Sequence, residues 1–215
     1  SRNVVARIEG TDKKDEILTL TAHYDSVPEG PGAYDNMAGA AIIMELCRYF
    51  QQHRPRRTME FVWFGAEEKG LLGSRDYIRV HESELGAHRF NMNVDLAGQL
   101  VGGNVLGVTG EASICDKLLE IAARAGIGAS TKNQIWGSDS NSFAWKGIPA
   151  MTLNRDGFGM HTRYDTIDLL SAWSLERSAI LLGCIADELG NAEVFPFERK
   201  MPEKFIRELD EYMCR

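Results

Sequence analysis

The chain has 215 residues, of which 44% are hydrophobic and 26% charged, and its formal net charge is −7 at pH 7. This composition is ordinary for a globular domain and excludes the collagen-like, disordered and coiled-coil classes, while the acidic balance argues against nucleic acid as the main partner. A chain of this length can bury one sizeable core, so we expect a single domain over residues 1–215.

Targeting signals are not evident in the sequence. No stretch reaches the run of about 18 apolar residues that a membrane span requires, and Ser1-Arg2-Asn3 does not begin a signal peptide. The localisation and the oligomeric state therefore stay open. Four cysteines are scattered without CxxC spacing, so they are expected to be small buried hydrophobic residues, although a disulfide is not excluded.

The first predicted elements are two strands. Residues 4–9 alternate apolar and polar side chains, residues 10–12 have turn composition, and the alternation resumes over residues 16–23. Two such strands joined by a short turn predict a β-hairpin.

Helices and further strands then alternate along the chain. Apolar residues at helical spacing predict helices at residues 40–50, 70–80, 114–125 and 175–189, with a short helix opening at residues 137–140. Short apolar runs predict strands at residues 61–64, 90–96 and 148–153, and a strand pair or bulge at residues 101–108. Residues 192–215 are expected to form a helical tail packed on the domain, and the whole pattern predicts an α/β fold.

The buried strand at residues 61–64 is followed by Gly65, Ala66 and two adjacent carboxylates, Glu67 and Glu68. An ionised carboxylate beside a hydrophobic core costs several kcal/mol unless a metal, a cation or a proton compensates it. Neighbouring side chains point in different directions, so one glutamate could bind a metal while the other carries a proton. A solvated loop or a helix start is the alternative interpretation.

Polar residues with metal-binding chemistry follow other predicted elements as well. His23 ends a strand, and Asp25 lies where a carboxylate could accept the second imidazole N–H and orient the ring. The alternative for His23 is a packed core histidine. Asp35 stands at a helix N-terminus, where it could act as an N-cap or could approach a metal closely because its neighbours are small.

In an open α/β sheet, ligands bind outside the carboxyl ends of the strands. That rule brings together two histidines and four acids from separate parts of the chain: His23, Asp35, Glu67, Glu68, Asp95 and His161. These groups would repel each other and lose hydration unless cations lie among them. We therefore expect two divalent metal ions, with Zn²⁺ favoured by the mixed His and carboxylate donors and Mn²⁺ or Co²⁺ as alternatives.

The ordered set of motifs resembles the co-catalytic zinc aminopeptidases of the M28 type, a family that includes relatives acting as carboxypeptidases. The resemblance covers most of the chain and rests on His23-Tyr24-Asp25, residues 32–39, residues 66–74, Asn93-Val94-Asp95, Ser138-Asp139 before residues 147–150, Met160-His161-Thr162 and Asp165-Thr166. It implies a single zinc-exopeptidase-like domain with a mixed central sheet flanked by helices on both faces.

The resemblance also implies a role for each site residue. His23 and Glu68 would hold one zinc, Asp95 and His161 the other, and Asp35 would bridge the two, while Asp25 orients His23. Glu67 would be the general base that takes a proton from the attacking water and returns it to the leaving amine. The family tends to have a non-proline cis peptide after the bridging acid, which here would be the Asp35-Asn36 bond.

Two positions depart from the family pattern. Members often have His after the Ser-Asp pair, where this chain has Ser140, and often a Tyr shortly before it that helps to stabilise the oxyanion, where this chain has Ile135-Trp136. The oxyanion partner is therefore open, with Tyr24, Tyr34, Tyr164 or a metal ion alone as candidates.

The function expected from these motifs is that of an aminopeptidase acting on peptides. A carboxypeptidase or amide deacylase with the same centre is the first alternative, and it would need a cation such as Arg155 or Arg163 for the terminal carboxylate. A single-zinc glutaminyl-cyclase-like transferase and a non-catalytic binding domain are further alternatives. Tyr24, Arg155 and Tyr164 are the expected substrate-binding residues, and loops at residues 98–103 and 126–138 are expected to set the side-chain preference.

Overall fold

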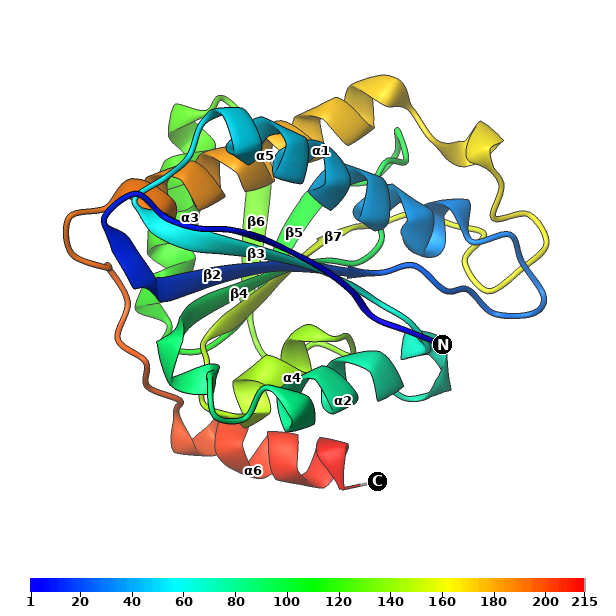
Figure 1. Cartoon of the computed structure of the whole chain (residues 1–215). Coiled ribbons are helices and arrows are strands. Elements are labelled where there is room, and N and C mark those ends of the chain that lie inside the picture. The colour runs from blue at the N-terminus through cyan, green and yellow to red at the C-terminus, as the bar shows by residue number, and fades with distance from the viewer. Residues whose placement is uncertain (215) are drawn as a thin grey trace.

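The computed structural model describes residues 1–214, so Arg215 at the end of the expected tail lies outside the described residues. Its centre is a seven-stranded mixed sheet in the order β1-β3-β2-β4-β7-β5-β6 (Figure 1). The strands are β1 (Val4–Ile8), β2 (Lys13–His23), β3 (Arg57–Phe64), β4 (His88–Val94), β5 (Asn104–Thr109), β6 (Ala129–Asn133) and β7 (Ala150–Arg155).

Helices cover both faces of this sheet, as expected from the resemblance (Figure 1). One layer contains α1 (Ala38–Gln52), α3 (Ser113–Arg124) and α5 (Ala172–Asn191); the other contains α2 (Leu72–Val80), α4 (Ser140–Trp145) and α6 (Glu203–Met213). Short turns are η1 (Ala33–Met37), η2 (Glu67–Lys69), η3 (Leu85–Ala87) and η4 (Ile167–Leu169). None of the helices within residues 1–214 is long and apolar enough to cross a bilayer.

The hairpin predicted for the first two strands is wrong. β1 pairs antiparallel with β3, and β2 pairs parallel with β3 and with β4, so β3 lies between the first two strands. Burial explains this order. β3 is buried along nearly its whole length and suits the sheet interior, whereas Val4 and Val5 of β1 are 53% and 44% exposed and suit an edge.

Most of the other predicted elements are confirmed within a few residues. The expected strand pair at residues 101–108 is a single strand, β5, and the predictions did not include β6. β6 has the sequence Ala-Ser-Thr-Lys-Asn and lies mostly exposed at the sheet edge, so it carries no apolar alternation that would reveal it. The cysteines are free, with Cys47 and Cys115 buried and Cys214 exposed.

The two faces of the central strands differ in chemistry. Leu18, Leu20 and Ala22 of β2 belong to the apolar core under α1 and α5. The opposite face carries buried hydrogen bonds: Thr21 donates to Asn93 over 2.8 Å, and Asn93 donates to Ser138 over 2.7 Å. This polar chain ties β2 and β4 to the segment that begins α4, and so fixes the residues around Ser138 above the sheet.

The buried histidine that begins β4, His88, makes the stability of the fold depend on pH. His88 has no solvent exposure, its Nδ1 lies 2.7 Å from Thr19 Oγ1, and burial lowers its pKa to about 4. In the unfolded chain, the pKa of a histidine is about 6.5. Between about pH 6.5 and pH 4, the unfolded chain therefore binds a proton at His88 that the folded chain does not bind. Stability is therefore lost as the pH falls from 6.5 towards 4.

We predict that His88→Gln removes this pH dependence. Between pH 7 and pH 4, the wild-type chain should lose up to about 3 kcal/mol more unfolding free energy than the variant. Urea denaturation of both chelator-treated proteins across this range measures the difference. Parallel stability curves for the two proteins would contradict the assignment.

Candidate metal centre

The residues expected at the carboxyl ends of the strands line one cavity of about 270 Å³. His23 ends β2, Glu67 and Glu68 form η2 after β3, and Asp95 follows β4 directly. The full lining is His23, Asp35, Glu67, Glu68, Gly70, Leu71, Asp95, Leu96, Trp136, Gly137, Asn154, Met160, His161 and Tyr212. All six expected metal-site side chains therefore meet at this edge of the sheet.

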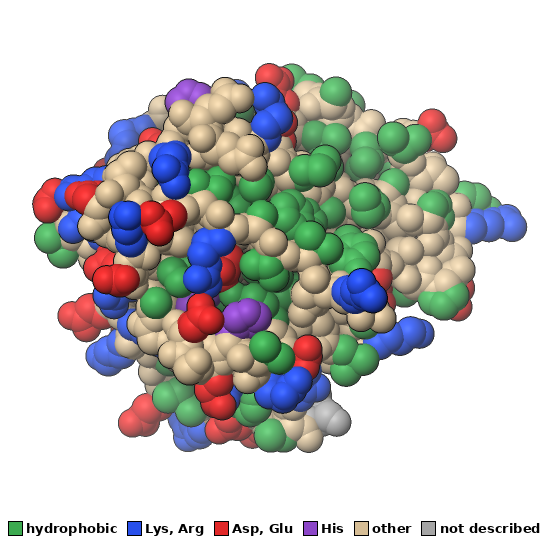
Figure 2. Space-filling model, in the orientation of Figure 1, with side chains coloured by type: hydrophobic (Ala, Val, Ile, Leu, Met, Phe, Trp, Pro, Cys, Tyr) green, Lys and Arg blue, Asp and Glu red, His purple; other side chains and the backbone are tan. Residues whose placement is uncertain are grey.

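A larger cavity of about 570 Å³ lies elsewhere, between α1 and α5, and its walls are mainly apolar. Figure 2 shows hydrophobic side chains gathered over α1. Met37 and Met44, which are 49% and 62% exposed, line a separate apolar cavity of about 360 Å³. Within residues 1–214, every group of side chains with metal-binding spacing lies in the smaller cavity, so we identify that cavity as the candidate site.

Asp35 stands at the centre of the candidate site, and its two carboxylate oxygens face different partners. His23 Nε2 lies 3.3 Å from Asp35 Oδ1 and 3.5 Å from Asp95 Oδ1. His161 Nε2 lies 3.0 Å from Asp35 Oδ2 and 3.2 Å from Glu68 Oε2. Donor atoms at metal-binding spacing form three groups, and two of them share Asp35: His23-Asp35-Asp95 and Asp35-Glu68-His161. The third group is His23-Glu67-Glu68.

The resemblance implied another pairing, with His23 and Glu68 on one ion and Asp95 and His161 on the other. That pairing stays a prediction, because His23 and Glu68 also share a group at metal-binding spacing. β2 lies between β3 and β4, so the strand order brings both Glu68 and Asp95 to the strands that flank His23. β2 and β4 are direct neighbours, so His23 and Asp95 emerge side by side. Glu68 emerges beyond β3, and His161 reaches it from the loop that follows β7.

Asp35 is held in place by Asp165, which belongs to one of the motifs that carry the resemblance. Asp165 is 1% exposed, and its two carboxylate oxygens accept hydrogen bonds from the backbone N–H groups of Tyr34 at 2.6 Å and Asp35 at 3.0 Å. The peptide bond between Asp35 and Asn36 is cis, as the resemblance implied. The Asn36 side chain then donates to the Val94 carbonyl over 2.7 Å, which ties this turn to the end of β4.

Asp25 holds a different set of atoms from the one expected. Its carboxylate accepts hydrogen bonds from the backbone N–H groups of Glu67 at 3.0 Å and Glu68 at 3.3 Å. His23 Nδ1 lies 3.1 Å from the backbone carbonyl of Asp25 and 3.7 Å from its carboxylate. Asp25 therefore orients His23 mainly through its backbone, and its side chain positions the glutamate pair.

The electrostatics of the site indicate an excess of negative charge. Burial alone would lower the pKa of His23, but the carboxylates of Asp25, Asp35 and Asp95 raise it well above its ordinary value. Burial raises the pKa of Glu68, and the neighbouring Asp35 raises it further. These raised pKa values mean that the excess negative charge favours protonation of both groups. Bound cations would stabilise the site in the same way.

Glu67 has the most perturbed carboxylate of the pair. Burial raises its pKa to about 9; the imidazole of His23 opposes this rise, and the carboxylates of Asp139 and Asp95 add to it. Burial also raises the pKa of Asp139 to about 7, and neither of its carboxylate oxygens has a hydrogen-bond partner among residues 1–214. The Oε1 atom of Glu68 is buried and unpartnered in the same way. A buried carboxylate oxygen without a hydrogen-bond partner is suited to bind a cation.

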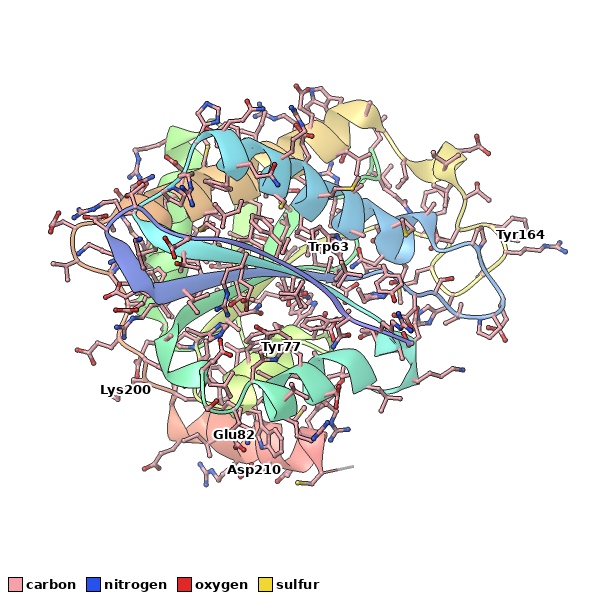
Figure 3. All side chains as sticks on the ribbon, viewed as in Figure 1. Trp63, Tyr77, Glu82, Tyr164, Lys200 and Asp210 are labelled. Carbon is pink, nitrogen blue, oxygen red and sulfur yellow. The ribbon has the colours of Figure 1, made fainter. Side chains whose placement is uncertain are left out.

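The three expected substrate-binding residues lie outside the lining of the cavity. The Tyr24 hydroxyl donates to the Arg2 carbonyl over 2.6 Å. Arg155 is buried and donates to the carbonyls of Gln99 at 2.6 Å and Leu100 at 3.1 Å. Tyr164 is 62% exposed, and Figure 3 shows it at the tip of its loop, directed away from the sheet.

Other side chains form the walls instead. Leu71, Leu96, Trp136 and Met160 line the cavity, and Tyr212 reaches it from α6. Trp136 belongs to the loop at residues 126–138 that was expected to shape the specificity pocket. Tyr212 was expected only as part of the helical tail packed on the domain, because its helical spacing carries no signal of a site built from distant parts of the chain.

We predict that Asp25→Asn loosens the glutamate pair. The amide keeps one oxygen acceptor but loses the charge and the second acceptor, so unfolding free energy should fall by about 1–3 kcal/mol. Hydrogen exchange should accelerate at the backbone amides of Glu67 and Glu68. Asp15→Asn, at an exposed position of β2, is the matched control. Unchanged exchange at both glutamates would contradict the role of Asp25.

Comparisons with known proteins agree with this geometry. Residues 3–183 match the sequence profile described as peptidase family M28. Aminopeptidase YwaD of Bacillus subtilis is 31% identical over 161 residues, which cover 74% of this chain and 32% of that protein. Carboxypeptidase Q of Rattus norvegicus is 26% identical over 200 residues, which cover 90% of this chain and 42% of that protein.

Solved structures show the same fold. A zinc aminopeptidase from Bacillus subtilis superposes with a TM-score of 0.80 at 27% identity, covering 95% of this chain and 53% of that one. An aminopeptidase from Aneurinibacillus sp. strain AM-1 superposes with a TM-score of 0.77 at 26% identity, covering 91% and 50%. The chain spans about a third to a half of the length of these relatives. With its fold, its site and the match over residues 3–183 taken together, the chain belongs to peptidase family M28.

Proposed function

We propose that this chain is the catalytic domain of an aminopeptidase with a dinuclear zinc centre and Glu67 as its general base. The observation that carries the proposal is the position of Asp35 between two separate His and carboxylate pairs. One carboxylate with an oxygen towards each pair is the arrangement that a bridging ligand requires. A single-zinc transferase would need only one of these pairs as metal ligands.

The donor set fits two zinc ions. His23 and Asp95 would hold one ion, Glu68 and His161 the other, and Asp35 both; imidazole and carboxylate are common zinc ligands in catalytic sites. The buried, unpartnered Glu68 Oε1 is consistent with a role as ligand. When bound, such a pair supplies Lewis acidity that lowers the pKa of water and polarises a carbonyl.

Glu67 then has the position and the environment of a proton carrier. Its side chain lines the same cavity, and its backbone N–H is fixed by Asp25. Burial raises the pKa of Glu67 to about 9, and nearby cations would lower that pKa towards neutrality because opposite charge favours the carboxylate. At such a pKa, Glu67 can take a proton from the attacking water and give it to the leaving nitrogen.

The wall chemistry favours an aminopeptidase over a carboxypeptidase. A carboxypeptidase needs a cation for the terminal carboxylate of its substrate, yet no Lys or Arg is among the residues that line the cavity within residues 1–214. Arg155 uses its donors on backbone carbonyls, and Arg163 lies in an exposed loop with its guanidinium against Tyr164. The Leu71, Leu96 and Met160 walls favour a peptide with an apolar first residue.

Metal content per chain should be measured together with hydrolysis of free-amine and N-acetylated aminoacyl amides, before and after chelation. The proposal expects two zinc ions per chain and chelator-sensitive cleavage of the free-amine substrates only. Cleavage that ignores the amine would favour a carboxypeptidase or deacylase, and one ion per chain would contradict the dinuclear centre.

We predict that Glu67→Gln abolishes turnover without emptying the centre. Loss of a general base typically lowers kcat by about 100-fold to 10,000-fold, and zinc content should stay at the wild-type value. Glu82→Gln, at an exposed position in the turn after α2, is the control and should retain full activity. If Glu67→Gln loses zinc instead, Glu67 is a ligand and the assigned roles of the two glutamates are wrong.

A further inference from the structure

The C-terminal helix α6 delivers one side chain into the candidate site. Tyr212 lines the same cavity as His23, Asp35 and Glu67, although it lies near the end of the chain. Its hydroxyl oxygen lies over Gly137, at 3.5 Å from the position that a Cβ would take there. Residues 203–213 of α6 lie beyond the segment that matches the family profile, so this contribution is not part of the family match.

Helix α6 is firmly anchored on the domain. Phe205 and Leu209 are buried in a small apolar cluster with Ala144 of α4 and Ala150 of β7. Trp145 Nε1 donates to Asp210 Oδ1 over 2.8 Å, and Figure 3 shows Asp210 on α6.

A further hydrogen bond fixes the end of α6. The Arg75 guanidinium of α2 donates to the backbone carbonyl of Met213, directly beside Tyr212 in the sequence. Side chains from two other helices therefore hold the turn of α6 that carries the phenol. A hydroxyl on such a scaffold is preorganised rather than free to swing away.

The cavity contains many acceptors and few side-chain donors that could meet a carbonyl oxygen. The Asn154 amide is engaged with the Asp95 carbonyl at 3.0 Å. The Trp136 ring packs flat on Gly107, where an added Cβ would lie 2.4 Å from its Cε3 atom. Tyr212 lines the same cavity, so its hydroxyl is a further candidate donor for a substrate carbonyl.

The surroundings also keep the phenol in its donor form. Burial raises the pKa of Tyr212, and the carboxylates of Glu67 and Asp139 raise it further. A protonated hydroxyl beside Glu67 lies close to the place where proton transfer would occur. The oxyanion of an attacked amide develops within reach of the same base, so a donor here meets negative charge as it forms.

We propose that Tyr212 is a catalytic residue that donates a hydrogen bond to the carbonyl oxygen of the scissile amide; this inference rests on the proposed function. Water oxygen forms a bond to the carbonyl carbon, the carbonyl π electrons move to oxygen, and the Tyr212 O–H stabilises that oxyanion while Glu67 takes the water proton. When the C–N bond breaks, the electrons return to restore the carbonyl and Glu67 gives its proton to the amine nitrogen.

The three tyrosines suggested from the sequence as oxyanion donors do not line the cavity, whereas Tyr212 does. The Tyr24 hydroxyl is bonded to the Arg2 carbonyl, the Tyr34 hydroxyl donates to the Arg155 carbonyl, and Tyr164 points away from the cavity. Ile135-Trp136 occupies the segment where relatives often have their tyrosine. A helix from outside the matched segment thus supplies the donor.

The test is Tyr212→Phe in the zinc-loaded chain, with Tyr49→Phe on the exposed side of α1 as the matched control. The phenyl ring preserves the packing of α6, so zinc content and melting temperature should equal the wild-type values. We expect kcat to fall at least about tenfold with KM changed less than about threefold, because the hydrogen bond strengthens only in the transition state. The control should retain full activity.

A binding measurement separates this inference from the proposed function. Calorimetry should show that Tyr212→Phe weakens a tetrahedral phosphonate analogue at least about tenfold while affinity for a non-hydrolysable substrate analogue changes little. Wild-type activity with an unimpaired Tyr212→Phe would overturn the role of Tyr212 alone. An inactive wild-type enzyme with two zinc ions would contradict the proposed function, and equal weakening of both analogues would reduce Tyr212 to a general binding contact.

Discussion

The crowding of carboxylates at one edge of the sheet is the constraint on which the rest of the site depends. Asp35, Glu68 and Asp95 approach two histidines within 3.5 Å, and the three carboxylate side chains are largely buried. Such a cluster needs positive charge, and the raised pKa of His23 reflects that demand. The fold holds Asp35 in place through its backbone, because the Asp165 carboxylate accepts hydrogen bonds from the turn that carries Asp35.

Much of this site could be predicted from the sequence, because the residues that carry the chemistry directly follow predicted elements. His23, Glu68 and Asp95 each follow a run whose apolar pattern marks a strand, and the carboxyl ends of parallel strands share an edge. Those two facts bring the ligands together without any knowledge of strand order. The family resemblance then supplied roles, including the bridging position of Asp35, which agrees with its central place in the structure.

The remainder depended on information that local patterns do not contain. Alternation marks β1 and β2 as strands but says nothing of their partners in the sheet, so the predicted hairpin was wrong. Asp165 has the composition of a helix start, yet its partners lie 130 residues earlier in the chain. The sequence pattern around Tyr212 predicts only a helix that packs on the domain. Its place in the site could not be predicted, because only the tertiary fold brings α6 beside the carboxyl edge of the sheet.

Anomalous diffraction from crystals of the zinc-loaded chain tests the central claim most directly. The account predicts two zinc peaks about 3.5–4 Å apart, one beside His23 and Asp95, the other beside Glu68 and His161, with an Asp35 oxygen at each. A single peak would contradict the account, as would two peaks that do not share Asp35, because the crowded carboxylates would then have a different explanation.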